Sequence, residues 1–163
     1  MSLSSPAVKR SALVCTLTVV LIGVALAAWI GFGRVLFGWS GTIGMIMSLT
    51  VAPIALVLQG AAGLSMGSAL RRGHSIRRAI VAFVLAAGSG VLFGATVPEI
   101  TEAGARSFMA PTGESWAVEM TIALCNPLGI VYLGMSITTL VLSRTALRGP
   151  KIDAESHPEV GVG

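Results

Sequence analysis

Long stretches without charged residues divide the chain into apolar segments. Uncharged runs of 23, 36, 20 and 24 residues cover positions 11–33, 35–70, 79–98 and 120–143. A helix that crosses a bilayer needs about 20 apolar residues, and it pairs its own backbone amides and carbonyls, as a span in lipid must. None of the runs alternates with the period of two that a membrane β-barrel requires. The pattern therefore predicts an all-α integral membrane protein.

Four transmembrane helices follow from these runs. Two spans need about 40 residues plus a turn, so the run of 36 residues holds only one span. Its first part, around Gly38, is predicted to form the turn that precedes the second helix. We expect spans at about 11–33, 42–70, 79–97 and 119–143, within a membrane domain over 1–144 that is followed by a flexible cytoplasmic tail over 145–163.

The distribution of charge predicts how the helices are oriented. Nine of the 11 Lys and Arg residues flank one end of the predicted helices and two flank the other. Basic residues in short loops stay on the cytoplasmic side, so we expect a multi-pass protein of the cell membrane with both termini in the cytoplasm. Trp29, Trp39 and Trp116 fall at the outer boundaries, where amphipathic rings favour the headgroup zone.

The first apolar segment has a second interpretation. Lys9 and Arg10, an apolar run and the small-residue sequence Ala25-Leu26-Ala27 resemble a secretory signal with its cleavage site. Cleavage would leave three helices in the same orientation. The apolar run continues past this site to the length of a full span, which favours an uncleaved transmembrane helix.

The two halves of the chain resemble each other. Residues 8–14, which contain two basic residues before an apolar run, resemble residues 76–82. In the second and fourth spans, Pro53 and Pro127 are each followed seven residues later by a glycine. We interpret the pattern as a duplicated two-helix hairpin, an internal symmetry also found in some transporters. Chance similarity between apolar sequences is the alternative.

This pattern resembles that of uncharacterised small bacterial membrane proteins built from one or two copies of a two-helix hairpin. In that family the second helix of each hairpin carries a proline and ends at arginines. The resemblance covers most of residues 8–144 and implies a fold without an activity. The matching residues would be Trp116, Asn126, Pro127 and Arg144, with Trp39, Pro53 and Arg71 as the first copy.

The two prolines predict a small polar cavity in the outer third of the bundle. Proline lacks an N–H and crowds the carbonyl four residues back, so the carbonyls of Leu49 and Ala123 need other partners. The alternative is a pair of kinked helices whose carbonyls bond to nearby polar side chains. Gln59, near the midplane, could line a pathway or bond across a helix interface. The residues expected at the cavity are Thr50, Pro53, Gln59, Asn126 and Pro127.

Small and basic residues predict two further kinds of contact. Glycines four residues apart share a helix face and let two backbones approach closely. The candidates for such packing are Gly60, Gly63, Gly67, Gly90 and Gly94. The loop between the second and third spans is expected to contact anionic lipid headgroups as well as to fix the topology. Its basic residues are Arg71, Arg72, Arg77 and Arg78.

Composition narrows the range of functions. The chain is 54% hydrophobic and only 11% charged, whereas soluble domains are roughly 25% charged. Proton-driven and ion-driven carriers usually need an ionisable group inside the membrane, and no Asp, Glu, Lys or Arg lies within the core of any predicted span. Cys15 and Cys125 lie at different depths, so no disulfide is expected. We expect no catalytic, cofactor-binding or metal site. We also expect no nucleic-acid partner, because the basic residues flank the predicted spans and so serve the membrane topology.

Two functional hypotheses remain. The leading one is a non-catalytic membrane protein, either an accessory or assembly subunit or a homo-oligomer, whose partners are the lipid bilayer and itself or another membrane protein. The alternative is a small transporter or channel-like protein for a neutral or weakly polar solute, with a path through Asn126, Thr50 and Gln59. The outer loop over 98–118 is expected to be a solvated connector, although a partner could contact Phe108 and Met109.

Overall fold

A computed structural model describes residues 5–39, 41–102 and 104–149 of the chain. Most of the predicted tail over 145–163 therefore lies outside the described residues. The elements are α1 (Pro6–Phe32), the 3₁₀ helix η1 (Gly33–Phe37), α2 (Thr42–Leu49), α3 (Val51–Arg71), α4 (Arg77–Thr96), β1 (Glu99–Thr101), β2 (Gly104–Arg106) and α5 (Ser115–Arg148).

Four long apolar helices are confirmed. Four helical segments are each long and apolar enough to cross a membrane. They are α1 together with η1 (32 residues), α2 together with α3 (30 residues), α4 (20 residues) and α5 (34 residues). Large aliphatic side chains such as Leu21, Val57 and Ile130 are exposed along the outward faces. Lipid is the solvent in which such faces are stable. These features indicate a multi-pass membrane protein.

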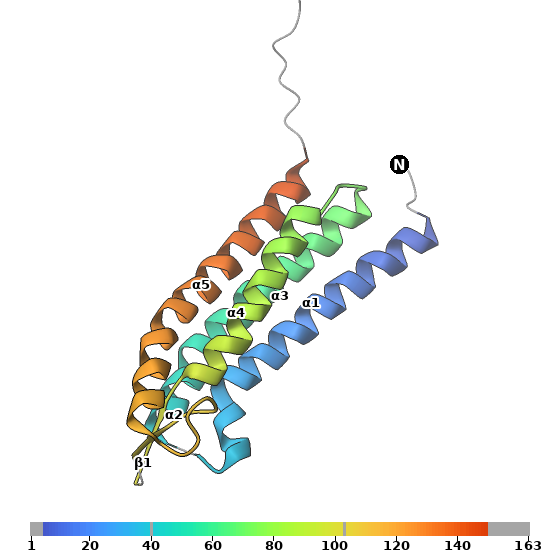
Figure 1. Cartoon of the computed structure of the whole chain (residues 1–163). Helices are drawn as coiled ribbons and strands as arrows, with labels where there is room; N and C mark the ends of the chain where they lie inside the picture. The colour runs from blue at the N-terminus through green and yellow to red at the C-terminus, as the bar shows by residue number, and fades with distance from the viewer. Residues whose placement is uncertain (1–4, 40, 103, 150–163) are drawn as a thin grey trace, which may run out of the picture.

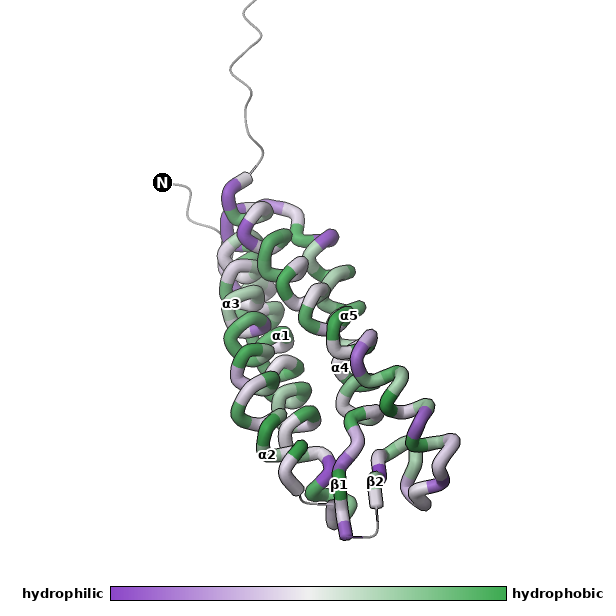
Figure 2. The backbone as a smooth tube through the Cα atoms, turned by 90° about the vertical axis from the view of Figure 1, so that its left-hand side faces the viewer, coloured by the Kyte–Doolittle hydropathy of each residue, from purple (hydrophilic) through white to green (hydrophobic). Residues whose placement is uncertain are grey.

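The helices form one elongated bundle (Figure 1). α1 packs along α3, α4 packs along α5, and α3 also contacts α5. α1 begins and α5 ends at the same end of the bundle, which we call the termini end; η1, α2 and the β1–β2 hairpin lie at the opposite end, the hairpin end. Hydrophilic residues gather at both ends, whereas the length between them is mostly hydrophobic (Figure 2).

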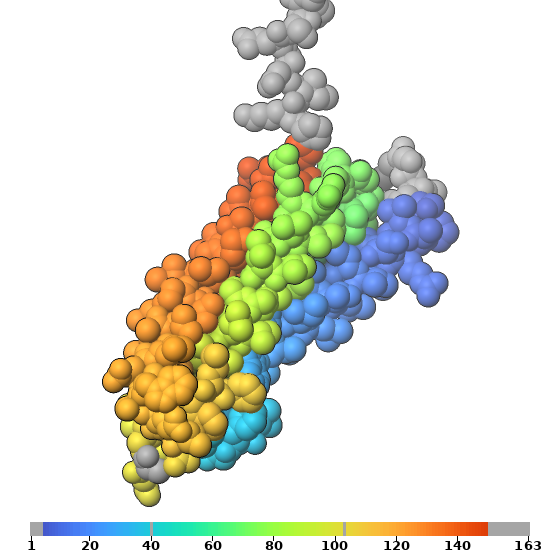
Figure 3. All heavy atoms as spheres, in the orientation of Figure 1, coloured from blue at the N-terminus to red at the C-terminus, as the bar shows by residue number. Residues whose placement is uncertain are grey.

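Small side chains allow the helices to pack closely. α4 fills the face between α1 and α5 in the space-filling view (Figure 3). One buried cluster, around Met66 and Phe83, joins α3 and α4, and a second, around Ile30, Phe93 and Tyr132, lies nearer the hairpin end. Both clusters join the two predicted hairpins, whereas the packing of α1 on α3 and of α4 on α5 lies within each hairpin. The origin of the hairpins by duplication stays a hypothesis.

The two prolines sit in different local structures. The second span is broken at Thr50, which separates α2 from α3 with φ −115° and ψ −73°. Pro53, three residues later, has no N–H to offer the Leu49 carbonyl, so the regular helix restarts beyond the break. α5 instead continues through Pro127 as a single helix of 34 residues. It also extends beyond the predicted span at both of its ends.

The connector between α4 and α5 contains structure that the apolar pattern did not predict. β1 and β2 pair antiparallel, with Glu99 opposite Arg106, and Ser107 forms an isolated bridge with Ala110. The side chain of Ser107 accepts a hydrogen bond from the Ala110 amide at 3.1 Å. Glu99 is fully buried. The expectation of a solvated connector is therefore wrong at this position, because a folded hairpin carries the carboxylate into the bundle.

Candidate functional site

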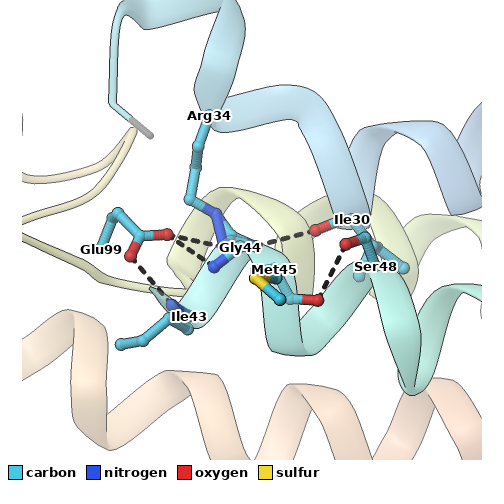
Figure 4. Close-up of polar contacts among 7 residues, drawn as sticks. All are labelled: Ile30, Arg34, Ile43, Gly44, Met45, Ser48 and Glu99. Atoms are coloured by element: carbon cyan, nitrogen blue, oxygen red, sulfur yellow. Dashed lines mark hydrogen bonds and ion pairs between the residues drawn. The ribbon is translucent and has the colours of Figure 1, made fainter. Parts of the chain in front are cut away.

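A buried ion pair lies at the hairpin end (Figure 4). Arg34, from η1, is 4% exposed, and Glu99, from β1, is 0% exposed. The Arg34 Nη1 lies 3.5 Å from the Glu99 Oε2. The Nη2 of Arg34 donates a hydrogen bond of 2.8 Å to the Ile30 carbonyl, so the guanidinium folds back over the end of α1.

The same carboxylate binds the first turn of α2. The Ile43 amide donates to Glu99 Oε1 at 3.0 Å, and the Gly44 amide donates to Glu99 Oε2 at 2.7 Å. The residue before α2 is Gly41, which has no side chain to bond these amides. Glu99 supplies the missing acceptor from 55 residues away in sequence, and its negative charge suits the positive end of the helix.

Glycines make room for the carboxylate. A Cβ on Gly44 would lie 3.1 Å from the Glu99 Oε2, and a Cβ on Gly41 would overlap the Glu99 carboxylate. Either side chain would push the carboxylate away from the α2 amides. The site is therefore a latch in which one carboxylate joins β1, η1 and α2.

The energetics of this latch depend on both partners. Removing one member of a buried ion pair costs about 3–5 kcal/mol, because the remaining charge has no compensation. Here the carboxylate also accepts two amide hydrogen bonds, while Arg34 Nε has no hydrogen-bond partner among the described residues. The arrangement holds the β1–β2 hairpin against α2 and the end of α1.

The residues of the predicted polar cavity are not brought together. Thr50, Pro53, Asn126 and Pro127 are exposed on the outer faces of the bundle. The Thr50 hydroxyl donates to the Ile46 carbonyl of its own chain segment at 2.6 Å. This bond satisfies the Thr50 hydroxyl at the break between α2 and α3 and leaves it facing away from the interior.

Gln59 differs from the other four because it is fully buried. Its Nε2 donates to the Ser136 Oγ at 3.0 Å, which links α3 to α5. A Cβ on Gly23 would lie 2.7 Å from the Gln59 Cβ, so the glycine gives this side chain its space beside α1. Of the two roles considered for Gln59, the structure thus shows a bond across a helix interface.

Most of the glycines singled out for packing lie against another helix. A Cβ on Gly63 would meet Val19 at 3.2 Å, and one on Gly67 would overlap Thr16. On α4, a Cβ on Gly90 would lie 2.7 Å from the Tyr132 ring, and one on Gly94 would overlap Trp29. Gly60 is different, because nothing lies within 4 Å of its Cβ position.

The basic loop lies at the termini end. Arg71 is the last residue of α3 and Arg77 the first of α4. The Arg72 Nη1 donates to the Leu147 carbonyl of α5 at 3.3 Å, so this arginine closes the end of a helix. Arg77 and Arg78 are exposed on the first turn of α4.

The remaining candidate groups are apart from one another. Cys15 and Cys125 are free, as the sequence predicts. Within the described ranges, no three His, Cys, Asp or Glu side chains form a group that could hold a metal ion. Comparison of the chain with protein-family models, with curated proteins and with solved structures finds no match. The suspected resemblance to small hairpin-built bacterial proteins therefore stays a hypothesis.

The positions of Arg34 and Glu99 in the sequence indicate their pairing, although the count of basic residues on each side of the membrane does not. Arg34 and Glu99 are single opposite charges that directly follow the first and third apolar runs, at the same predicted depth. A lone charge at such a boundary faces partial burial, and opposite charges at equal depth can neutralise each other. Their separation of 65 positions hides the pairing from any local pattern.

Proposed function

We propose that this protein is a non-catalytic multi-pass membrane protein that acts by association, as a homo-oligomer or as an accessory or assembly subunit. The observation that carries the proposal is a set of large apolar side chains on the connector between α4 and α5, outside the candidate spans. They are Ile100, Phe108 and Met109, which are 68%, 51% and 53% exposed. Apolar side chains exposed together mark contacts with other proteins or with a membrane, and we infer that these three serve such a contact.

The interior of the bundle supports an associating protein over a transporter. A path for a polar solute needs polar side chains that line a continuous opening. Gln59 and Ser136 instead bond to each other at full burial, and Thr50 and Asn126 point to the outer faces. The buried carboxylate of Glu99 is occupied by α2 and Arg34.

The orientation with both termini in the cytoplasm is part of the proposal. It rests on the basic residues, which concentrate at the termini end. α1 runs unbroken through the small-residue sequence that resembles a cleavage site, and Leu26 and Ala27 are buried there. A retained α1 is consistent with its extensive packing on α3.

Association is tested by co-expression of two differently tagged copies and purification in mild detergent. We expect capture of one tag to retain the other copy or a defined membrane partner. Ile100→Thr with Met109→Gln should abolish this retention, whereas Val84→Thr, at an exposed position on α4, should leave it unchanged. A particle that stays monomeric and free of any partner in detergent and in nanodiscs would refute the proposal.

Orientation is tested with single reporter cysteines. In a background with Cys15→Ala and Cys125→Ala, Thr112→Cys reports the connector between α4 and α5 and Ser75→Cys reports the α3–α4 loop; both positions are exposed. A membrane-impermeant maleimide should label Thr112→Cys in intact cells and Ser75→Cys only after lysis. The reverse labelling would invert the topology.

A further inference from the structure

A groove lies at the termini end, between the start of α4 and the last turns of α5. It encloses about 610 Å³. Its polar side is formed by His74, Ser75, Arg78 and Thr145, and its apolar side by Ile76, Leu142 and Ala146. A second hollow of about 460 Å³ adjoins it and is lined by Arg77, Arg78, Val81 and Leu142.

The two hollows lie side by side on the surface and share two lining residues. Arg78 and Leu142 border both of them, so the polar mouth lies next to an apolar track that Val81 of α4 and Leu142 of α5 line. Val81, one turn beyond Arg77, is 55% exposed on this track. The surface therefore carries positive charge at the ends of α4 and α5 and apolar side chains next to it.

The mouth of the groove is arranged to receive a negative group. Arg77 and Arg78 project from the first turn of α4 and are exposed. The Nδ1 of His74 is buried and has no hydrogen-bond partner within the described part of the chain. Every acidic residue that the structure describes lies in the connector between α4 and α5 or at the start of α5: Glu99, Glu102, Glu114 and Glu119.

We propose that this groove binds one anionic phospholipid, with its phosphate at Arg78 and His74 and an acyl chain along Leu142 and Val81. The proposal rests on the membrane orientation given above, which places the groove at the cytoplasmic leaflet, where anionic lipids concentrate. A soluble phosphate compound would satisfy the basic mouth but leave the apolar track empty. The track therefore favours a lipid over a free anion.

The test measures lipid retained by the purified full-length protein. Native mass spectrometry from detergent should show one bound phosphatidylglycerol and little phosphatidylcholine of the same chain length. One basic residue near a membrane surface contributes about 1 kcal/mol to binding an anionic lipid, so Arg78→Gln should weaken retention about fivefold. Arg10→Gln, a matched loss of an exposed arginine at the same end on α1, should leave retention unchanged.

A second variant tests the shape of the groove independently of its charge. Thr145 is exposed on the groove wall, so Thr145→Trp should block the mouth and Thr145→Ser should not. Helical circular dichroism and an unchanged elution volume establish that each variant is folded. Equal retention of phosphatidylglycerol by the protein, Arg78→Gln and Thr145→Trp would overturn the proposal, as would equal binding of phosphatidylcholine.

Competition identifies the source of the phosphate. Inorganic phosphate added at millimolar concentration should not displace phosphatidylglycerol, because it gains nothing from the apolar track. Displacement would assign the site to a soluble anion and overturn a lipid site. Failure of the lipid site and failure of the proposed function are separable results. Lipid retention is measured by native mass spectrometry, association by capture of two tagged copies, and orientation by the reporter cysteines.

Discussion

The two ends of the bundle use charge in opposite ways. At the hairpin end, Arg34 and Glu99 are buried against each other, with 4% and 0% of their surface exposed. At the termini end, Arg77 and Arg78 are exposed. A buried charge must be paired or it destabilises the fold, whereas an exposed charge contributes little to stability and is free to meet a ligand. The difference separates a buried charge pair that holds the fold together from exposed arginines that are suited to bind a ligand.

The contrast between the two ends is tested most directly by a substitution at Glu99. Glu99→Ala removes the partner of Arg34 and the acceptor of two α2 amides, so we expect the free energy of unfolding to fall by about 3–5 kcal/mol. Denaturation in detergent, followed by circular dichroism, measures the loss. Glu102→Ala, an exposed position three residues away, is the matched control and should change stability by less than about 0.5 kcal/mol.

A double variant decides whether the pair acts as a unit. Arg34→Met combined with Glu99→Leu removes both charges, and its loss should be smaller than the sum of the two single losses. Additive losses would mean that the two residues act separately, and the latch would then reduce to the contact between Glu99 and α2.

The termini end should depend on close packing instead of buried charge. A Cβ on Gly67 would overlap Thr16 of α1, whereas nothing lies within 4 Å of a Cβ on Gly60. Gly67→Ala should therefore lower the free energy of unfolding by about 1–3 kcal/mol through overpacking. Gly60→Ala should leave it unchanged or raise it by up to about 1 kcal/mol, because alanine favours the helix. Equal effects in the same denaturation measurement would contradict the assigned α1–α3 interface.

Between the two ends, Gln59 and Ser136 provide a buried polar contact without charge. Ser136→Ala removes the acceptor of the Gln59 amide, and we expect a loss of about 0.6–1.7 kcal/mol, as for other hydrogen bonds between membrane helices. Ser65→Ala is the matched control, because the Ser65 hydroxyl bonds only to the Ala61 carbonyl of its own helix. If both variants lose the same stability, the contact between α3 and α5 has no special role.

The sequence predicted the helices well because a single physical requirement sets them. Each span must be apolar over the thickness of the bilayer, so the runs at 11–33 and 79–98 end within a few residues of α1 and α4. The break at Thr50 and the unbroken path of α5 past Pro127 were harder to predict. Similar proline positions gave different local structures, so a proline alone does not decide whether a membrane helix breaks or continues.

The candidate sites were much less predictable than the helices. Gln59 meets a serine 77 positions away, and Glu99 meets amides 55 and 56 positions away. Depth in the membrane can be read from the sequence, but rotation about each helix axis cannot. That rotation placed Thr50 and Asn126 on the outer faces and Gln59 inside. The β1–β2 hairpin escaped prediction because strands of three residues carry no periodic signal.

The smallest effect on stability is expected at the termini end, and it is the sharpest test of the comparison. Arg78→Gln should change the free energy of unfolding by no more than about 0.5 kcal/mol, because an exposed side chain away from buried features contributes little. The same variant should weaken phospholipid retention about fivefold, so stability and binding separate at this residue. At Glu99 the buried carboxylate bonds to α2 and Arg34, so its removal should lower the free energy of unfolding. An Arg78→Gln loss as large as that of Glu99→Ala would show that the exposed arginines also hold the bundle together, and the distinction between the two ends would fail.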